Sequence, residues 1–405
     1  MIDVTNAVNQ VYSKKTPSIY FRNEQDIEPF LNNRKLFLLR MKLPPKLFVN
    51  SSLIDFGCGT GQNTLVYDHL GSNCTLLEYD NFSYNNALML FEKHAKHKFR
   101  IINTDIFNYD IQKERFDFVV SNGVAHHTKD PVRSIQLCCT ALKSGGFLLL
   151  GIGNKAGFFQ RNLQRFILYS IANNDAEIVK YSKLLFREHL RRSVRFSGRK
   201  LDEVIYDTYI NPKISAFGTA ELLRIFSKNN IQLYSSYQDI KDVENFIEPG
   251  YNQFRLRNPS TDPTQDSISE KGIFYSDIED ISLSNNNKIH TRLYQKLRSL
   301  APHFDAITDE VNDINFNDFD INKTEYLKKI NTYKEKLLKI EKIDFINKTH
   351  NKIFFDELST VITVLNKRSK KIDKLREIAI LLKGAKKLFR SINGVGMNYY
   401  CGYKN

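Results

Sequence analysis

Apolar runs and amphipathic stretches alternate along the first 150 residues of the chain. The apolar runs are four to six residues long, as expected for buried strands, and the stretches between two pairs of them have helical periodicity. Strands alternating with helices predict a parallel sheet with right-handed crossovers and helices on both faces. The strands are expected at residues 53–56, 75–79, 99–103, 116–121 and 147–152, and helices at 83–97 and 132–142.

Further elements are expected on both sides of this region. Residues 1–50 predict a leading helical cap, with Pro44 and Pro45 marking the entry to the first strand. After the fifth strand, residues 153–218 read as an insertion with a helix over 158–172. Thr219 then heads an amphipathic helix, and residues 231–237 read as a sixth strand.

The remaining third of the chain changes in composition. Residues 257–322 are rich in Asn, Asp, Ser and Pro and predict a loop-rich acidic connector. Leu and Ile recur at three- and four-residue steps over 323–391, which predicts two or three helices. The short tail 397–405 is rich in aromatic residues. The organisation expected is therefore 1–50, 51–256, 257–322 and 323–405.

A glycine-rich turn follows the first strand. Residues 53–61 read Leu-Ile-Asp-Phe-Gly-Cys-Gly-Thr-Gly, with glycines at alternate positions. Glycine lets a backbone turn sharply and approach a bound ligand closely. Strand, glycine turn and helix form the start of a nucleotide-binding crossover. The spacing is G-x-G-x-G, whereas the dinucleotide fingerprint G-x-G-x-x-G has its third glycine one place later.

An acid follows the second strand at the spacing expected for a ribose ligand. Glu78 lies 23 positions after Asp55, near the roughly 20 residues that separate a glycine turn from a ribose-binding acid. A carboxylate has two acceptor oxygens and can take both hydroxyls of a cis-diol. The other interpretation is an acid that caps the next helix, and Asp80 is the alternative if the strand end is shifted.

These patterns resemble those of one family. The acid and glycines of 55–61 resemble motif I of the class I S-adenosylmethionine-dependent methyltransferases. Residues 116–131 and 142–146 resemble two further segments of that family, with Ala125 where leucine is usual and Ser144 where proline is usual. The resemblance covers about residues 50–240. It implies a Rossmann-like, doubly wound α/β sheet of seven strands, here with a helical insertion and a C-terminal helical region. Sheets of this family usually finish with an antiparallel strand, and the tail 397–405 is expected to supply it.

The resemblance implies S-adenosylmethionine as the cofactor. Glu78 is then expected at the ribose, and Asp105 at the adenine amino group. The other residues expected to bind the cofactor are Asp55, Gly57, Cys58, Gly59, Gly61, Tyr79, Ile106 and Asn122. No residue pattern indicates a metal, because His94 and His97, expected on one helix, have lysine-rich neighbours and no further ligands.

The segment after the fourth strand offers candidates for catalysis. His126 and His127 stand where the resemblance expects the methyl group, and a histidine can remove a proton near neutral pH. One or both could instead pack or hydrogen-bond within the loop. Candidates for substrate contacts in the insertion are Arg192, Tyr206 and Tyr209, of which the tyrosines could equally be packing residues.

Composition and charge set the broader limits. The chain of 405 residues has a formal net charge of +14 and five cysteines. The cysteines lack paired C-x-x-C spacing, and the first residues lack the basic start and apolar core of a signal peptide. With no apolar run long enough to span a bilayer, a cytoplasmic protein is expected. Arginines cluster at 187–199, whereas the C-terminal lysines alternate with acids as on a solvated helix.

Methyl transfer to a small-molecule or glycan-type acceptor is the first functional interpretation. The segment after the fourth strand lacks the Asn/Asp-Pro-Pro-Tyr motif in which adenine-amino methyltransferases resemble one another, and it lacks the cysteine that cytosine-C5 enzymes need. An RNA methyltransferase that binds the backbone through its basic regions is the alternative. A non-catalytic module that binds S-adenosylmethionine is a second one. The sequence contains nothing that indicates an oligomeric state.

Overall fold

The computed structural model describes the chain in nine stretches and divides it into two compact units. The first unit is Met1–Gly153, Glu221–Asp239 and Met397–Asn405, and the second is Asn154–Ala220 and Ile240–Gly396. Most of the expected connector 257–322 lies outside the described residues. Those residues are 19–111, 115–197, 199–237, 299–311, 314, 319, 321–339, 348–390 and 397–405.

A seven-stranded mixed sheet forms the centre of the first unit. Its strand order is β3-β2-β1-β4-β5-β7-β6, with β1 to β5 parallel and β7 antiparallel to both of its neighbours. The order reverses beside β1, between β1 and β4, and a crevice at such a switch point is where doubly wound sheets bind ligands. The strands are β1 (Ser52–Phe56), β2 (Asn73–Glu78), β3 (Phe99–Asn103), β4 (Phe116–Asn122), β5 (Leu142–Gly153), β6 (Ile231–Tyr237) and β7 (Met397–Lys404).

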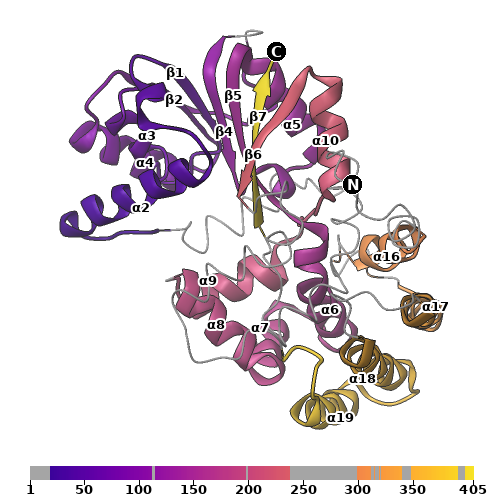
Figure 1. The fold of residues 1–405 in the computed structure, drawn as a ribbon. Coiled ribbons are helices and arrows are strands. Elements are labelled where there is room, and N and C mark those ends of the chain that lie inside the picture. Colours follow the sequence, from indigo (N-terminus) through magenta and orange to yellow (C-terminus); the bar gives the residue numbers. More distant parts are fainter. Residues whose placement is uncertain are drawn as a thin grey trace. The chain divides into compact units, whose positions relative to one another are not determined.

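The last strand comes from the far end of the sequence. The tail that was expected to supply a strand forms β7, which lies between β5 and β6 and is drawn in yellow in Figure 1. Gly402 is needed at this pairing, because a Cβ there would lie 2.4 Å from a methyl carbon of Ile231. Buried Lys404 extends from the end of β7 and donates to the carbonyl oxygens of Cys139 and Leu142 at 3.2 and 2.9 Å.

Helices cover both sides of this sheet, as Figure 1 shows. Their cover explains why the central strands are almost continuously apolar, since a parallel sheet is buried on both faces. One face packs Leu53, Leu76 and Val120 against Leu38 and Phe91 of the flanking helices. The helices of this unit are α2 (Ile27–Arg40), α3 (Leu65–His69), α4 (Asn81–His94), α5 (Pro131–Ala141) and α10 (Thr219–Lys228), with 3₁₀ turns η1 (Glu24–Asp26), η2 (Pro45–Phe48) and η3 (Ala125–His127).

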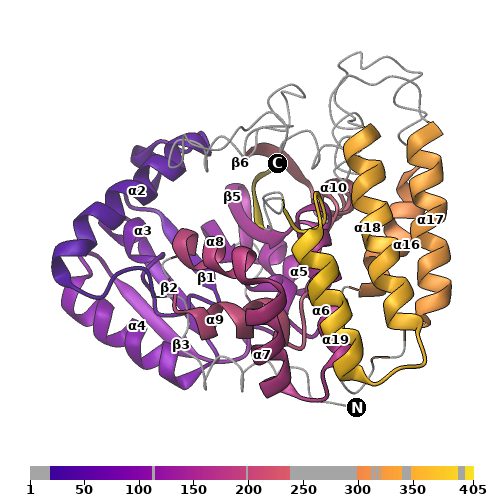
Figure 2. The same cartoon turned by 90° about the horizontal axis from the view of Figure 1, so that it is seen from below.

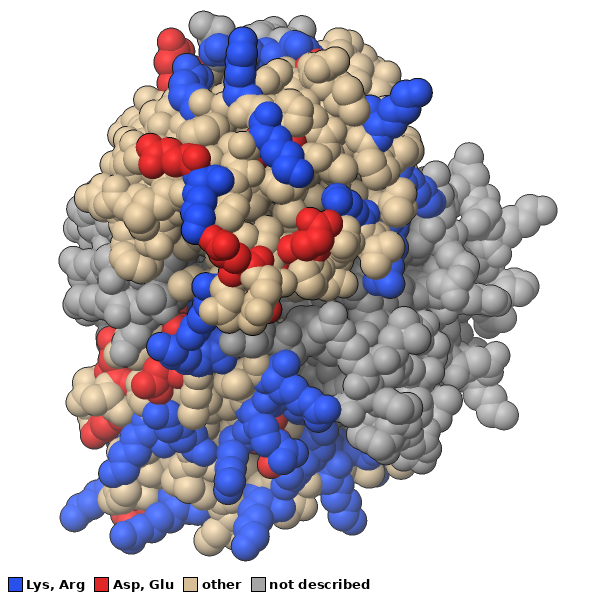
Figure 3. All heavy atoms as spheres, turned by 90° about the vertical axis from the view of Figure 1, so that its left-hand side faces the viewer, with Lys and Arg blue, Asp and Glu red and all other residues tan. Residues whose placement is uncertain are grey.

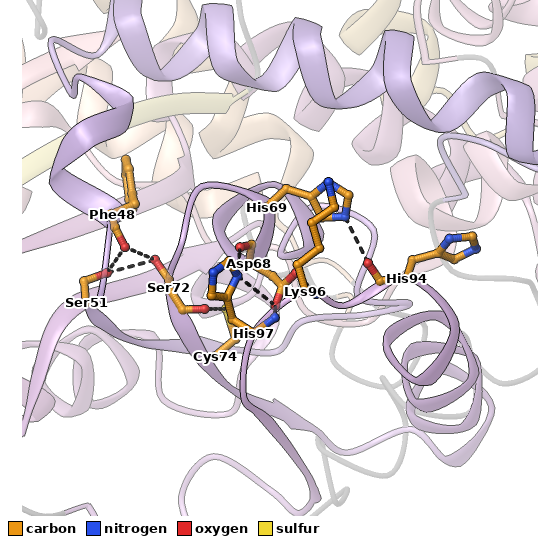
Figure 4. A network of polar contacts seen from close by, with 9 residues as sticks. All are labelled: Phe48, Ser51, Asp68, His69, Ser72, Cys74, His94, Lys96 and His97. Atoms are coloured by element: carbon orange, nitrogen blue, oxygen red, sulfur yellow. Dashed lines mark hydrogen bonds and ion pairs between the residues drawn. The ribbon is translucent and has the colours of Figure 1, made fainter.

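The helix expected over 83–97 ends earlier, at His94, because a buried acid binds the backbone that follows it. Figure 4 shows the carboxylate of Asp68 accepting from the backbone N–H groups of Lys96 and His97 at 2.7 and 2.9 Å. The ring of His97 also donates to the Asp68 carbonyl at 2.7 Å. The expectation that His94 and His97 share a helix was therefore wrong. Within the described residues no cluster of metal-ligating side chains occurs.

The second unit is helical where it is described. Residues 155–210 form a series of helices, and Figure 2 shows α17 and α18, drawn in orange and yellow, side by side. Helices were expected in both regions, at 158–172 and 323–391. Their bounds are α6 (Lys155–Ile171), α7 (Asp175–Leu185), α8 (Arg187–Ser197), α9 (Leu201–Ile205), the π-helix η4 (Tyr206–Ile210), α16 (Ala301–Thr308), the 3₁₀ turn η5 (Asp309–Val311), α17 (Lys323–Lys339), α18 (Lys348–Asn366) and α19 (Lys371–Gly384).

Two further findings concern the chain as a whole. All five cysteines are free and buried, and Cys138 and Cys139 fill small apolar positions of α5 as expected. Of the helices that the structure describes, none has both the length and the apolar character required to cross a membrane.

Deleting residues 397–405 tests the role of β7. The deletion leaves β5 and β6 without their shared partner and removes the Lys404 contacts, so we expect the first unit to lose cooperative unfolding or to unfold at least roughly 10 °C lower. Thermal unfolding followed by circular dichroism measures this. A chain that lacks exposed Asn405 alone is the matched control, and full thermal stability of the longer deletion would contradict the prediction.

Candidate active site

A cavity of about 250 Å³ opens at the carboxyl ends of β1, β2 and β4, and every residue that lines it belongs to the first unit. Its volume is close to the lower bound of about 300 Å³ typical of small-molecule sites. The structure brings together most of the residues that were expected to bind a cofactor or to act in catalysis. Those in its wall are Asp55, Gly57, Cys58, Gly59, Glu78, Tyr79, Asp105, Ile106, Asn122 and His127.

The glycine turn forms one wall of the cavity, and its glycines serve different purposes. Gly57 and Gly59 have φ of +78° and +58°, a left-handed conformation that side chains disfavour. A Cβ on Gly57 would lie 2.6 Å from Val124, so packing also excludes a side chain there. A Cβ on Gly59 would meet no atom within 4 Å. Gly61 lies outside the cavity wall and packs against Phe91 and Ala87.

Glu78 joins the end of β2 to this turn. One carboxylate oxygen accepts from the Gly59 N–H at 2.8 Å, and the other accepts from the N–H groups of Tyr79 and Asp80, both at 2.9 Å. Burial raises the pKa of Glu78 in spite of these bonds. The carboxylate is therefore fixed in the wall, and each oxygen retains lone pairs for a further donor.

Asp55 lies at the end of β1 and is 2% exposed. One of its oxygens accepts from the hydroxyl of Thr64 at 2.5 Å. The other, Oδ1, is buried and has no hydrogen-bond partner among the described residues. Burial raises the pKa of Asp55 to about 7, against the lowering effect of the Thr64 hydrogen bond, and the nearby charge of Glu78 raises it further. The site thus holds an acid that a cationic or N–H-bearing ligand would satisfy.

The segment after β3 completes the wall on the side of Glu78. Asp105 accepts from the N–H of Phe107 at 2.9 Å, which holds its carboxylate at the start of the loop. Ile106 is 7% exposed, and Tyr79 is partly exposed beside it in the cavity wall. Lys129 lies 4.9 Å over the ring of Phe107. A flat apolar group could pack between these side chains while its polar edge met Asp105.

The two histidines after β4 have different surroundings. His127 lines the cavity. His126 is 2% exposed, lies outside the wall, and accepts from the N–H of Gly153 through Nδ1 at 3.3 Å. Their rings lie 4.2 Å apart. His126 is therefore held by the sheet at the end of β5, and His127 is the one that faces the cavity.

Sequence reasoning missed a contact between the cavity and the N-terminal segment. Gln62 accepts from the N–H of Tyr20 at 2.6 Å and donates to the Phe21 carbonyl at 2.8 Å. Tyr20 and Gln62 both line the cavity. Gln62 stands directly after the third glycine, so its position in the motif could have marked it. Tyr20 carries no local signal, because 42 residues separate it from its partner.

The residues expected to contact a substrate belong to the second unit. Arg192 on α8 and Tyr206 at the start of η4 are half-buried. Tyr209 is fully buried, and its hydroxyl donates to Gln164 at 2.7 Å. Burial raises the pKa of Tyr209. None of the three lines the cavity described above.

Replacing Asp55 by Asn tests its buried carboxyl. A carboxyl whose pKa is raised to about 7 contributes stability that is present below its unfolded pKa of about 3.9 and is lost as the pH rises toward 7. Asn keeps an acceptor for Thr64 but does not ionise. The unfolding free energy of Asp55→Asn should thus exceed that of the wild type by a few kcal/mol at pH 8 and by much less at pH 5.

Urea unfolding at pH 5, 6, 7 and 8 measures this difference. Asp105→Asn, which changes a half-buried acid of the same wall, is the control. Parallel profiles for Asp55→Asn and the wild type would disprove the assignment.

Comparison with known proteins agrees with this geometry. Residues 54–150 match the family model described as a methyltransferase domain. A search of curated proteins found no match. Among solved structures, a methyltransferase-like protein of Bacillus halodurans is 16% identical with a TM-score of 0.32, over 51% of this chain and 70% of that one. Magnesium protoporphyrin IX methyltransferase of Synechocystis, solved with its cofactor, is 10% identical with a TM-score of 0.37, over 58% and 90%.

These identities and TM-scores are too low to transfer a substrate. The family match covers the strands that build the cavity, from β1 to β5, and those strands carry the glycine turn and the acids at their carboxyl ends. Residues 54–150 of this chain therefore form a methyltransferase domain.

Proposed function

We propose that this methyltransferase acts on a small-molecule or glycan-type acceptor. The observation that carries the proposal is the cavity itself. The backbone of Gly59, the carboxylates of Asp55 and Glu78 and the ring of His127 all line it. Such a wall suits a cationic nucleoside together with a small second ligand.

The residues present fit the cofactor. The partnerless Oδ1 of buried Asp55 requires a donor or a cation, and the open space beyond Gly59 lets a ligand meet the backbone directly. When bound, S-adenosylmethionine supplies an electrophilic methyl group on a sulfonium. In this proposal Glu78 accepts from the ribose hydroxyls, and Asp105 accepts from the adenine amino group. Tyr79 and Ile106 pack on the base.

His127 is proposed as the general base. A ring nitrogen of His127 would take the proton of the acceptor atom. That atom would bond to the methyl carbon while the bond from this carbon to the sulfonium sulfur breaks, so that a neutral thioether leaves. His126, buried and held by Gly153, is assigned the lesser role of fixing the turn η3 on which His127 stands. Holding the acceptor and the cofactor in line within the cavity would also accelerate methyl transfer, because two bound reactants avoid the entropy cost of meeting in solution.

The segment after β4 supports a small acceptor. Asn122 and His127, at and after the end of β4, line the cavity. Enzymes that modify a base must hold the flipped base in such a pocket. Neither a Pro-Pro-Tyr sequence nor a cysteine nucleophile is present between 121 and 131.

RNA is the second candidate acceptor, and one observation favours it. Figure 3 shows one face of the molecule, on which lysine and arginine side chains gather toward the bottom of the view with few acids among them. Helix α8 carries four arginines, and the side chain of Arg191 is 74% exposed. A surface of this kind can bind a phosphate backbone through charge alone.

Labelled product distinguishes the two acceptors. The purified chain is incubated with tritiated cofactor and fractions of a cell extract, and the label is followed before and after ribonuclease treatment. We expect ribonuclease-resistant label in a fraction of low molecular mass. Label that ribonuclease releases, together with RNA binding that weakens steeply with salt, would replace this proposal with the RNA alternative.

Two substitutions should separate binding from chemistry. Glu78→Gln removes a charged acceptor and should weaken S-adenosylhomocysteine binding about ten- to a hundredfold. His127→Ala should lower turnover about a hundredfold or more, while S-adenosylhomocysteine binding stays within about threefold of the wild type. Calorimetry gives the affinities, and initial rates on the labelled product give turnover. Equal loss of both quantities in His127→Ala would remove its assignment as the base.

A further inference from the structure

The second unit contains a group of buried and half-buried polar side chains, and none of these residues lines the cofactor cavity. We call it the α6–η4 polar cluster, and it consists of Arg161 and Gln164 on α6, His189 on α8, Arg199 between α8 and α9, and Asp207 and Tyr209 on η4. All six residues belong to the same compact unit. Gln164 and Tyr209 have no exposed surface.

Arg161 has no ionic partner in this cluster. Its guanidinium lies 4.8 Å over the ring of Phe158, a buried residue. Arg161 is half-buried, and among the described residues its Nε is buried without a hydrogen-bond partner. This cation–π contact holds the guanidinium beside the ring, and the guanidinium has five N–H donors in a planar fork.

The acid that could neutralise Arg161 is already paired. Asp207 accepts from Arg199 at 2.9 Å, with 29% and 14% of the two side chains exposed. Burial lowers the pKa of Arg161, Asp207 acts against this, and the charge of Arg199 lowers it further. Burial also holds the pKa of His189 well below its usual value, with the charges of Arg161 and Arg192 acting in the same direction. Among the described residues Asp207 thus pairs with Arg199, and only its more distant charge acts on Arg161.

Gln164 adds a second unsatisfied donor beside Arg161. The two residues are three positions apart on α6, so their side chains are neighbours on one helix face. The Oε1 of Gln164 accepts from the hydroxyl of Tyr209, while its Nε2 is buried and has no partner among the described residues. Tyr209 and Asp207 both stand on the π-helix η4, whose wide turn is frequent at functional sites.

The unsatisfied groups of Arg161 and Gln164 are both N–H donors, and the surrounding charge is positive. A water molecule would satisfy the donors and leave the charge uncompensated, whereas an anion would do both. The planar fork of an arginine matches two oxygens of a phosphate or a carboxylate. We propose that the α6–η4 polar cluster is a binding site for a small oxyanion, a phosphate or carboxylate group, held by Arg161 and Gln164, with Arg199 adding positive charge.

Direct binding of two probes tests the site. Inorganic phosphate and succinate are titrated separately into the full chain at constant ionic strength, with sodium chloride as the reference salt, and binding is measured by calorimetry and by thermal unfolding. We expect at least one probe to bind saturably and to raise the unfolding temperature above that in chloride. Preference for phosphate or for succinate identifies which oxyanion the site takes.

Arg161→Met should weaken binding of that probe about ten- to a hundredfold, as expected for the loss of charge-assisted hydrogen bonds. Arg161→Lys keeps the positive charge but lacks the planar fork of the guanidinium. Its affinity for the probe should lie between those of the wild type and of Arg161→Met. Arg191→Met removes an exposed arginine paired with Glu188 and should bind like the wild type. The unfolding temperature of Arg161→Met without probe should equal or exceed that of the wild type, because no ion pair is lost.

Three results would overturn the proposal. One is a wild-type chain that responds to neither probe beyond its response to chloride. Another is unchanged probe affinity in Arg161→Met. The third is a large loss of thermal stability in Arg161→Met without probe, which would make Arg161 a structural residue. S-adenosylhomocysteine binding, measured on the same samples, should be unchanged by Arg161→Met, so failure here is distinct from failure of the cofactor site.

Discussion

The methyltransferase domain depends on a carboxylate that holds a glycine turn in place. Parallel pairing of β1 with β2 sets Asp55 opposite Leu76 and Phe56 opposite Leu77, so Glu78 comes level with the turn. Its oxygen then accepts from the Gly59 N–H at 2.8 Å. The glycine turn therefore exposes its backbone to the cavity, and the carboxylate of Glu78 places negative charge beside the turn. Burial raises the pKa of Asp55, the charge of Glu78 raises it further, and the two acids suit the cavity to a cation.

The sheet of the first unit is completed by a strand from the far end of the sequence. Strand β5 pairs with β4 on one side and with β7 on the other, although β7 begins 244 residues after β5 ends. Pairing between segments so distant is entropically costly to form. The buried contacts of β7 and the bonds of Lys404 offset that cost. The chain can therefore leave the sheet after Gly153, build a second unit, and return.

The two units present opposite electrostatic conditions to a ligand. In the first, Asp55 and Glu78 place acids in an apolar wall. In the second, the carboxylate of Asp207 pairs with Arg199, and Arg161 carries a further positive charge. A sulfonium nucleoside suits the first environment and an oxyanion the second. Burial strengthens both preferences, because a charge removed from water interacts more strongly with what remains near it.

Much of the first unit follows from local sequence. Strands β1 to β5 are continuous apolar runs and Gly57 to Gly61 is a short motif, so neighbouring residues determine each of them, and the family resemblance adds the last strand. Other features depend on partners that are distant in sequence. Asp68 ends α4 at His94, Gln62 binds Tyr20, and Gly153 holds His126 away from the cavity. Arg161 meets Asp207 only through packing of α6 with η4. Periodicity reports which face of an element is apolar, whereas the pairing of buried polar groups is decided by which elements the tertiary fold brings together.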